Sequence, residues 1–216
     1  MLLLDNKYLQ MGKSNYLWIL DAGHGGLTSE GKYTTAPAKM HKYSDGLTYY
    51  EGVINRVITE IVFKHLELKQ IDFALVYNDV EDTPLSQRVT IADSVYRKDK
   101  RAVYLSIHSN AGGGSGFEIF TSPGQTKSDK VGNIFCDIYQ KCFPNFPMRK
   151  DLSDADADKE ADFYVLRKTD CPAVLVENLF FDNRKEAEFL LSLDGQKQIA
   201  NCIIQCIETV EKLKPI

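Results

Sequence analysis

The stretch Tyr16-Leu17-Trp18-Ile19-Leu20-Asp21-Ala22-Gly23-His24-Gly25-Gly26 carries the strongest structural signal in this sequence. Its first five residues form a continuous apolar run, which is typical of a strand buried on both faces of a parallel sheet. Glycines then surround a histidine, as expected for a turn at the end of a strand. The stretch therefore predicts a buried strand that delivers His24 into a glycine-rich turn.

Apolar runs and helical patterns alternate along the rest of the chain. Further strands are predicted at residues 73–77, 102–107, 116–120, 164–166 and 173–176. Apolar residues at helical spacing predict helices over residues 50–69, 83–96, 128–143, 183–191 and 193–214. Thr83 is the expected N-cap of its helix and Pro84 the expected first helical residue. The alternation predicts a three-layer α/β sandwich with a mainly parallel central sheet of about six strands, flanked by helices.

Two segments between these elements are predicted to be irregular, residues 27–48 and residues 144–162. The second contains the acidic run Asp151–Asp158. That run lacks the glycine and the distal glutamate of a calcium-binding loop, so a solvated loop, which could border the active site, is expected.

The composition is that of an ordinary folded protein. The chain has 216 residues, a net charge of −4 and 44% hydrophobic residues. At this length folding hides roughly 70% of the chain's surface, so residues 1–216 are predicted to form one domain, and we expect a monomer. The acidic balance argues against nucleic acid as a partner, and no apolar stretch approaches the ~20 residues of a membrane span.

The N-terminus and the cysteines exclude further classes. Met1-Leu2-Leu3-Leu4 is followed at once by Asp5, which is too short for the apolar core of a signal peptide, so synthesis in the cytoplasm is expected. The five cysteines include no C-x-x-C pair, so they indicate neither a disulfide framework nor a thiolate zinc site.

Four side chains are predicted to meet at one edge of the sheet. His24, His108 and Glu177 each follow or end a predicted strand, and Glu51 lies in the first turn of the first helix. In an open α/β sheet the carboxyl ends of the strands form the functional crevice. His24, Glu51 and His108 match the three protein ligands of a catalytic zinc ion, and Glu177 is the candidate general base.

Each of the four also has a structural interpretation. His24 could cap a backbone group in its turn, and His108 could be a hydrogen-bonded residue at a strand end. Glu51 alone is typical of a solvated acid that stabilises a helix N-terminus. Glu177 is the least ordinary, because a carboxylate directly after an apolar strand is expected to be buried.

Other polar residues near these positions are weaker candidates. Asn55 lies one helical turn after Glu51 and could support it, or be an ordinary exposed residue. His65 is interpreted as structural, and His41 as a surface residue that could border the substrate. The glycines around His24 fail the dinucleotide pattern and Gly12-Lys13-Ser14 lacks the first P-loop glycine, so nucleotide binding is not expected.

Together these motifs resemble those of the zinc-dependent N-acetylmuramoyl-L-alanine amidases that cleave bacterial peptidoglycan, the type 3 family catalytic domain. The resemblance covers about residues 16–210 and rests on the following segments: Asp21–Gly26, Glu51 with Asn55, Leu85–Ala92, Ser106–Ala111, Gly116–Phe120 and Pro172–Glu177. It implies one Zn²⁺ per chain held by His24, Glu51 and His108, with Glu177 as the catalytic acid and base. The implied reaction is hydrolysis of the amide between N-acetylmuramic acid and L-alanine, and the implied partner is peptidoglycan, reached after release or export. Asn55, Asn110 and Arg167 are further candidates for residues that support the ligands or contact the substrate.

One position departs from the commonest family pattern, because Leu179 stands where many members have glycine after the base. Two other functions stay open at this point. A carboxypeptidase-like zinc peptidase would need a cation for a terminal carboxylate, and Arg149 or Arg167 could supply it. A non-catalytic cell-wall-binding module is the second alternative.

Overall fold

The computed structural model describes residues 9–10, 14–153 and 156–214. Its main sheet has seven strands in the order β1-β5-β2-β6-β9-β7-β8. These strands are β1 (Leu9–Gln10), β2 (Leu17–Ala22), β5 (Asp72–Leu75), β6 (Ala102–Asn110), β7 (Phe117–Thr121), β8 (Lys159–Glu160) and β9 (Ala173–Phe180). The pairs β5–β2, β2–β6, β6–β9 and β7–β8 are parallel, whereas β1–β5 and β9–β7 are antiparallel. The predicted fold class is confirmed.

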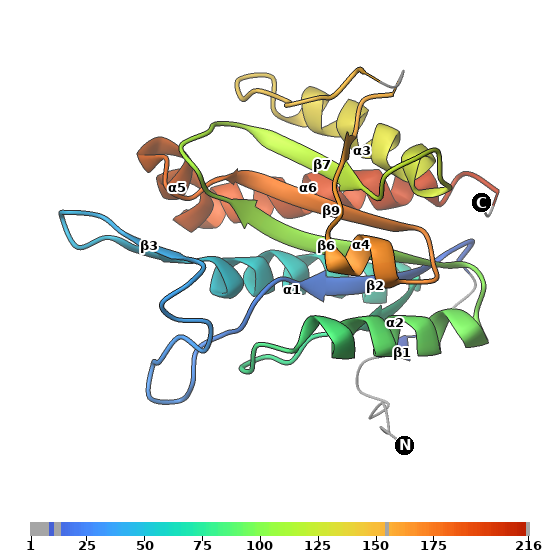
Figure 1. The fold of residues 1–216 in the computed structure, drawn as a ribbon, viewed down its shortest axis with the longest axis horizontal. Helices are drawn as coiled ribbons and strands as arrows, with labels where there is room; N and C mark the ends of the chain where they lie inside the picture. Colours follow the sequence, from blue (N-terminus) through green and yellow to red (C-terminus); the bar gives the residue numbers. More distant parts are fainter. Residues whose placement is uncertain (1–8, 11–13, 154–155, 215–216) are drawn as a thin grey trace.

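The described residues form six helices, which cover the two faces of this sheet (Figure 1). They are α1 (Glu51–Lys69), α2 (Leu85–Lys98), α3 (Ser128–Cys142), α4 (Tyr164–Lys168), α5 (Arg184–Leu191) and α6 (Leu193–Val210). Side chains of α1, α3, α5 and α6 share one apolar core with one face of the sheet, and those of α2 and α4 share a second core with the other face. In Figure 1, α4 lies in front of the sheet and α6 behind it.

The local sequence explains why these elements form. All six residues of β2 are buried, as a strand covered by helices on both faces requires. In α1 the buried apolar residues Ile54, Ile58, Val62 and Leu66 recur every four positions, so one stripe of the helix faces the core. Gln70 ends this helix in the left-handed conformation, and its N–H bonds the carbonyls of the last turn.

Several predicted elements were wrong. Residues 164–166 form part of helix α4, because a short apolar run does not distinguish strand from helix. Residues 27–48 were predicted to be a loop, but they include β3 (Met40–Lys42), which pairs with β4 (Thr48–Tyr50). Strand β8 likewise lies within the predicted irregular segment 144–162.

The start of α2 also differs from its prediction. Pro84 is the N-cap, and Leu85 is the first helical residue. Thr83 lies before the helix, where its Oγ1 accepts a hydrogen bond from the backbone N–H of Asn78 at 3.0 Å. The helices of the described residues include none with the length and apolar character needed to cross a bilayer.

Candidate metal centre and active site

The turn after β2 brings His24 over the carboxyl edge of the sheet. His24 has a φ of 65°, in the left-handed region. Gly23 precedes it, and a Cβ at Gly23 would lie only 2.1 Å from Cε1 of His108. Glycine at this position therefore lets the turn approach the His108 ring directly.

Helix α1 supplies Glu51 from its first residue, and β6 supplies His108. The imidazole Nε2 of His24 lies 3.2 Å from Glu51 Oε1, and His108 Nδ1 lies 3.1 Å from the same oxygen. The two imidazole rings stand edge to face, with centroids 4.9 Å apart. One ligand atom from each of the three residues lies within 4.8 Å of the other two. The sequence prediction that these residues converge is reproduced by this geometry.

The chemistry of this donor set fits a cation. His24 Nε2 and Glu51 Oε2 are buried and have no hydrogen-bond partner among the described residues. Leaving such atoms unpaired is costly, and a metal ion coordinated by all three residues would satisfy them. Two imidazole nitrogens and a carboxylate oxygen are the ligand types of catalytic zinc.

The charges of the three residues are strongly linked. Burial alone would raise the pKa of Glu51, but its close contacts with the imidazoles of His108 and His24 lower it to about 2. Burial lowers the pKa of His24, which favours the neutral imidazole that a metal requires. Burial acts the same way on His108, but its bond to Glu51 outweighs this and raises the pKa.

Glu177 faces this cluster from β9. It is paired in register with His108, so both side chains point to the same face of the sheet. Its Oε2 is buried and has no hydrogen-bond partner among the described side chains and backbone. Burial raises the pKa of Glu177 to about 8, and a carboxyl group with a pKa near neutrality can both accept and return a proton.

A buried network of hydrogen bonds and an ion pair, which was not predicted from the sequence, supports the ligand cluster. Asp21, at 1% exposure, accepts hydrogen bonds from Tyr104 Oη at 2.6 Å and Ser106 Oγ at 2.8 Å, and pairs with Arg88. Ser106 Oγ in turn lies 3.1 Å from His108 Nε2. Such a partner orients the ring that binds the metal. An aspartate in an otherwise apolar buried strand was the available signal.

Arg88 connects this network to the turn. Its guanidinium donates to the carbonyl oxygens of Ala22 at 2.8 Å, His24 at 3.0 Å and Thr83 at 2.8 Å. Asn55, predicted to support Glu51, is buried and instead donates to the Gly23 carbonyl at 3.3 Å. These bonds fix the backbone on both sides of His24.

A cavity of about 280 Å³ opens beside the cluster. Its lining includes His24, His108 and Glu177, together with the apolar or aromatic side chains of Leu85, Phe163 and Tyr164. The polar groups thus meet an apolar and partly aromatic wall, as in many small-molecule sites.

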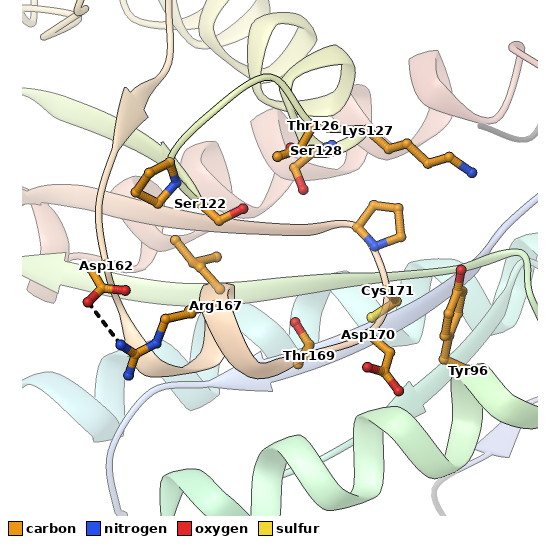
Figure 2. Close-up of a pocket in the computed structure, with 13 residues that line it drawn as sticks. Tyr96, Ser122, Thr126, Lys127, Ser128, Asp162, Arg167, Thr169, Asp170 and Cys171 are labelled. Atoms are coloured by element: carbon orange, nitrogen blue, oxygen red, sulfur yellow. Dashed lines mark hydrogen bonds and ion pairs between the residues drawn. The ribbon is translucent and has the colours of Figure 1, made fainter.

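Arg167 does not belong to this cavity. It lines a separate cavity of about 600 Å³ together with residues such as Tyr96, Lys127 and Asp170 (Figure 2). There it forms an ion pair with Asp162 at 3.0 Å, which Figure 2 marks with a dashed line. Asn110 ends β6, two residues after His108, and its Nδ2 donates to Glu118 at 2.5 Å.

The remaining histidines lie outside the cluster. His65, interpreted as structural, pairs with Glu208 at 2.9 Å on α6. His41 is partly exposed and packs edge to face on Tyr43, with ring centroids 4.4 Å apart.

The acidic segment is only partly the solvated loop that was predicted. Asp158 is 1% exposed and accepts a hydrogen bond from Thr121 Oγ1 at 2.6 Å. Carboxylate oxygens of Asp129, Asp156 and Asp158 lie within 4.8 Å of one another. Burial raises the pKa of Asp158 to about 6. Packing against α3 and β7 therefore buries a carboxylate that composition alone assigns to the surface.

Comparison with known proteins identifies the family of this chain. The sequence profile of Amidase_3, described as N-acetylmuramoyl-L-alanine amidase, matches residues 19–209. The chain belongs to the Amidase_3 family. The match includes all four residues of the cluster described above.

A curated relative agrees with this assignment, and solved structures share the fold. The chain is 31% identical over 177 residues to N-acetylmuramoyl-L-alanine amidase CwlM of Bacillus licheniformis, covering 80% of this chain but only 60% of the relative. The N-acetylmuramoyl-L-alanine amidase of Clostridium difficile 630 has the same fold, with a TM-score of 0.72, 22% identity and coverage of 92% and 98%. Ami1 of Mycobacterium smegmatis gives a TM-score of 0.74 at 19% identity, with coverage of 93% and 99%.

The Leu179 departure from the amidase pattern has a structural explanation. Leu179 has a φ of 61°, the left-handed conformation that favours glycine, and its side chain is fully buried. It lies where the pairing of β6 and β9 shifts register, between the pairs His108–Glu177 and Asn110–Phe180. The backbone of this Amidase_3 chain thus keeps the turn, and burial of the leucine side chain offsets the strain.

Proposed function

We propose that this chain hydrolyses the amide between N-acetylmuramic acid and L-alanine in bacterial peptidoglycan. The observation that carries the proposal is the approach of His24, Glu51 and His108 to within 4.8 Å beside Glu177, with two of their buried polar atoms making no hydrogen bond among the described residues. Family membership and the amidase relatives support the substrate class. Residues 1–216 would form a single catalytic domain, and the cell wall would be its site of action.

His24, Glu51 and His108 would hold one zinc ion. When bound, zinc polarises the scissile carbonyl and lowers the pKa of water in the site. Asp21 and Ser106 keep the His108 ring in place, and Arg88 and Asn55 hold the backbone on both sides of His24. The chain therefore offers a preorganised ligand set.

Glu177 would transfer the proton. Its carboxylate takes a proton from the water that attacks the carbonyl carbon, and returns it to the amine as the carbon–nitrogen bond breaks. The products are a free lactyl carboxyl group on the sugar and a peptide with a new N-terminal L-alanine.

Digestion of purified peptidoglycan tests this proposal. The wild-type chain should release new N-terminal L-alanine, and a chelator should abolish this release until zinc is added back. Glu177→Gln should keep one zinc per chain and lose more than about 100-fold in rate, whereas the exposed control Glu67→Gln should match the wild type. Near wild-type activity of Glu177→Gln, or any other new terminus, would overturn the proposal. A terminus within the peptide would favour the peptidase alternative.

A further inference from the structure

Glu118 of β7 extends the row of active-site side chains across the sheet. It is paired in register with Glu177 of β9, which is itself paired with His108 of β6. Residues paired across neighbouring strands point to the same face, so the three side chains follow one another along that face. With strands ~4.8 Å apart, the backbone of Glu118 lies about 10 Å from that of His108.

Two cations share the Glu118 carboxylate, which is only 4% exposed. Arg149 Nε and Lys159 Nζ lie 2.8 Å and 2.7 Å from its Oε1, and Asn110 Nδ2 bonds its Oε2 at 2.5 Å. Burial acts to raise the pKa of Glu118, but the two cations outweigh it and lower the pKa, so the carboxyl group is ionised. One cation would neutralise it. The second leaves a surplus positive charge beside the active site.

Arg149 is held in position, and its contact with Glu118 leaves part of its guanidinium group able to bind another ligand. Its backbone N–H donates to the Phe117 carbonyl at 2.9 Å, and its guanidinium carbon lies 5.4 Å from the centre of the Phe180 ring. Only Nε donates to Glu118, and the two terminal nitrogens donate to no hydrogen bond among the described residues. The side chain is 44% exposed. An oriented guanidinium with free donors matches the geometry of a carboxylate ligand.

We propose that Arg149 and Lys159, fixed by Glu118, bind a carboxylate on the second or third residue of the peptide that leaves the active site. This inference rests on the proposed function. On the sugar side of the scissile amide, the lactyl carboxyl group is consumed in that amide, so a carboxylate bound by this pair would belong to the peptide side. An extended peptide advances ~3.3–3.6 Å per residue, so its second and third residues lie about 7 and 10 Å from its start, comparable to the spacing of about 10 Å between the backbones of His108 and Glu118.

Two pairs of synthetic muramoyl peptides test the inference. In one pair the carboxylate of the second residue is either free or converted to a carboxamide, and in the other pair the same change is made at the third residue. The wild-type chain should prefer the free carboxylate at one of these positions by about tenfold or more in kcat/KM, mainly through KM. Arg149→Gln should reduce that preference to less than about threefold, and Arg149→Lys should retain part of it. Lys159 still pairs with Glu118 in both variants, so they should fold, which thermal unfolding and zinc content would verify.

Arg167→Gln is the matched control. Arg167 is similarly exposed and also pairs with a carboxylate, but it lines the separate cavity, so its variant should keep the wild-type preference. Equal cleavage of free and amidated substrates by the wild type, or an unchanged preference in Arg149→Gln, would overturn the inference. Absence of new N-terminal L-alanine from every substrate would instead refute the proposed amidase activity.

Discussion

Replacing Gly23 by alanine would place one methyl group against a proposed metal ligand. The Cβ would lie 2.1 Å, 2.4 Å and 2.5 Å from Cε1, Nδ1 and Nε2 of His108. Carbon atoms in contact are normally ~3.5–4.0 Å apart, so the ring or the turn has to move by about 1.5 Å. The ring has little room to do so, because Glu51 and Ser106 hold its two nitrogens.

The size of the effect follows from that displacement. Loss of a single residue that orients a ligand typically lowers metal affinity by about 10–100-fold, and here the ligand itself is displaced. We therefore expect Gly23→Ala to weaken zinc binding by about 100-fold or more. A shift of about 1 Å in a catalytic group costs about 100-fold in rate, so activity at limiting zinc should fall further. The overpacked site should also lose about 1–3 kcal/mol of stability.

Competition with a chromophoric zinc chelator measures this affinity directly, and peptidoglycan digestion measures the activity. Gly31→Ala provides the control, because Gly31 has a φ of 78° and nothing within 4 Å of an added Cβ. That variant should lose about 1 kcal/mol of stability from backbone strain and keep the wild-type zinc affinity. Zinc affinity within threefold of the wild type, together with normal digestion of peptidoglycan by Gly23→Ala, would show that this close approach does not constrain the site.

Three further predictions concern buried residues. Arg88→Met should lower the free energy of unfolding by about 3–5 kcal/mol, because it leaves the buried Asp21 carboxylate without its cation. Adding Asp21→Asn should recover part of that loss. A midpoint of chemical denaturation that is unchanged in Arg88→Met would contradict this prediction. Burial raises the pKa of Asp158 from 3.8 to about 6, because the folded protein disfavours the ionised carboxylate. With a chelator present, the free energy of unfolding should therefore fall by up to about 3 kcal/mol as the pH rises from about 4 to above 6. Asp158→Asn should remove that loss and be the more stable protein at pH 8 but not at pH 4, and equal effects at both pH values would count against it. Leu179→Gly should destabilise the fold by about 1–3 kcal/mol in thermal unfolding, because losing the buried side chain costs more free energy than relieving the left-handed backbone strain returns. A variant more stable than the wild type would show that the strain is the larger of the two effects.

Much of the fold could be predicted from the sequence because its signals are local. The apolar run in Leu17–Ala22 and the four-residue spacing in α1 each depend on neighbouring residues alone. Short strands were not predicted, because contacts with distant residues rather than local sequence define them. Strands β3 and β8 have only three and two residues, so their hydrogen-bonded partners rather than their own composition define them.

The sequence by itself determined that His24, Glu51, His108 and Glu177 would lie at one edge of a parallel sheet. Strand direction places the end of every parallel strand at the same edge, so the order of motifs is sufficient for that inference. The sequence could not determine which polar residues support these four side chains. Asp21, Ser106 and His108 form a chain of contacts across β2 and β6, and only the register between those strands brings them together.

Tertiary structure likewise decided the roles of the arginines. The sequence alone does not distinguish the three arginines discussed above. In the structure, Arg88 is buried beneath the site, Arg149 pairs with Glu118, and Arg167 lines a different cavity. The physical reason is that the effect of a charge depends on its distance from other charges and on its burial, and both are set by contacts between residues far apart in the chain.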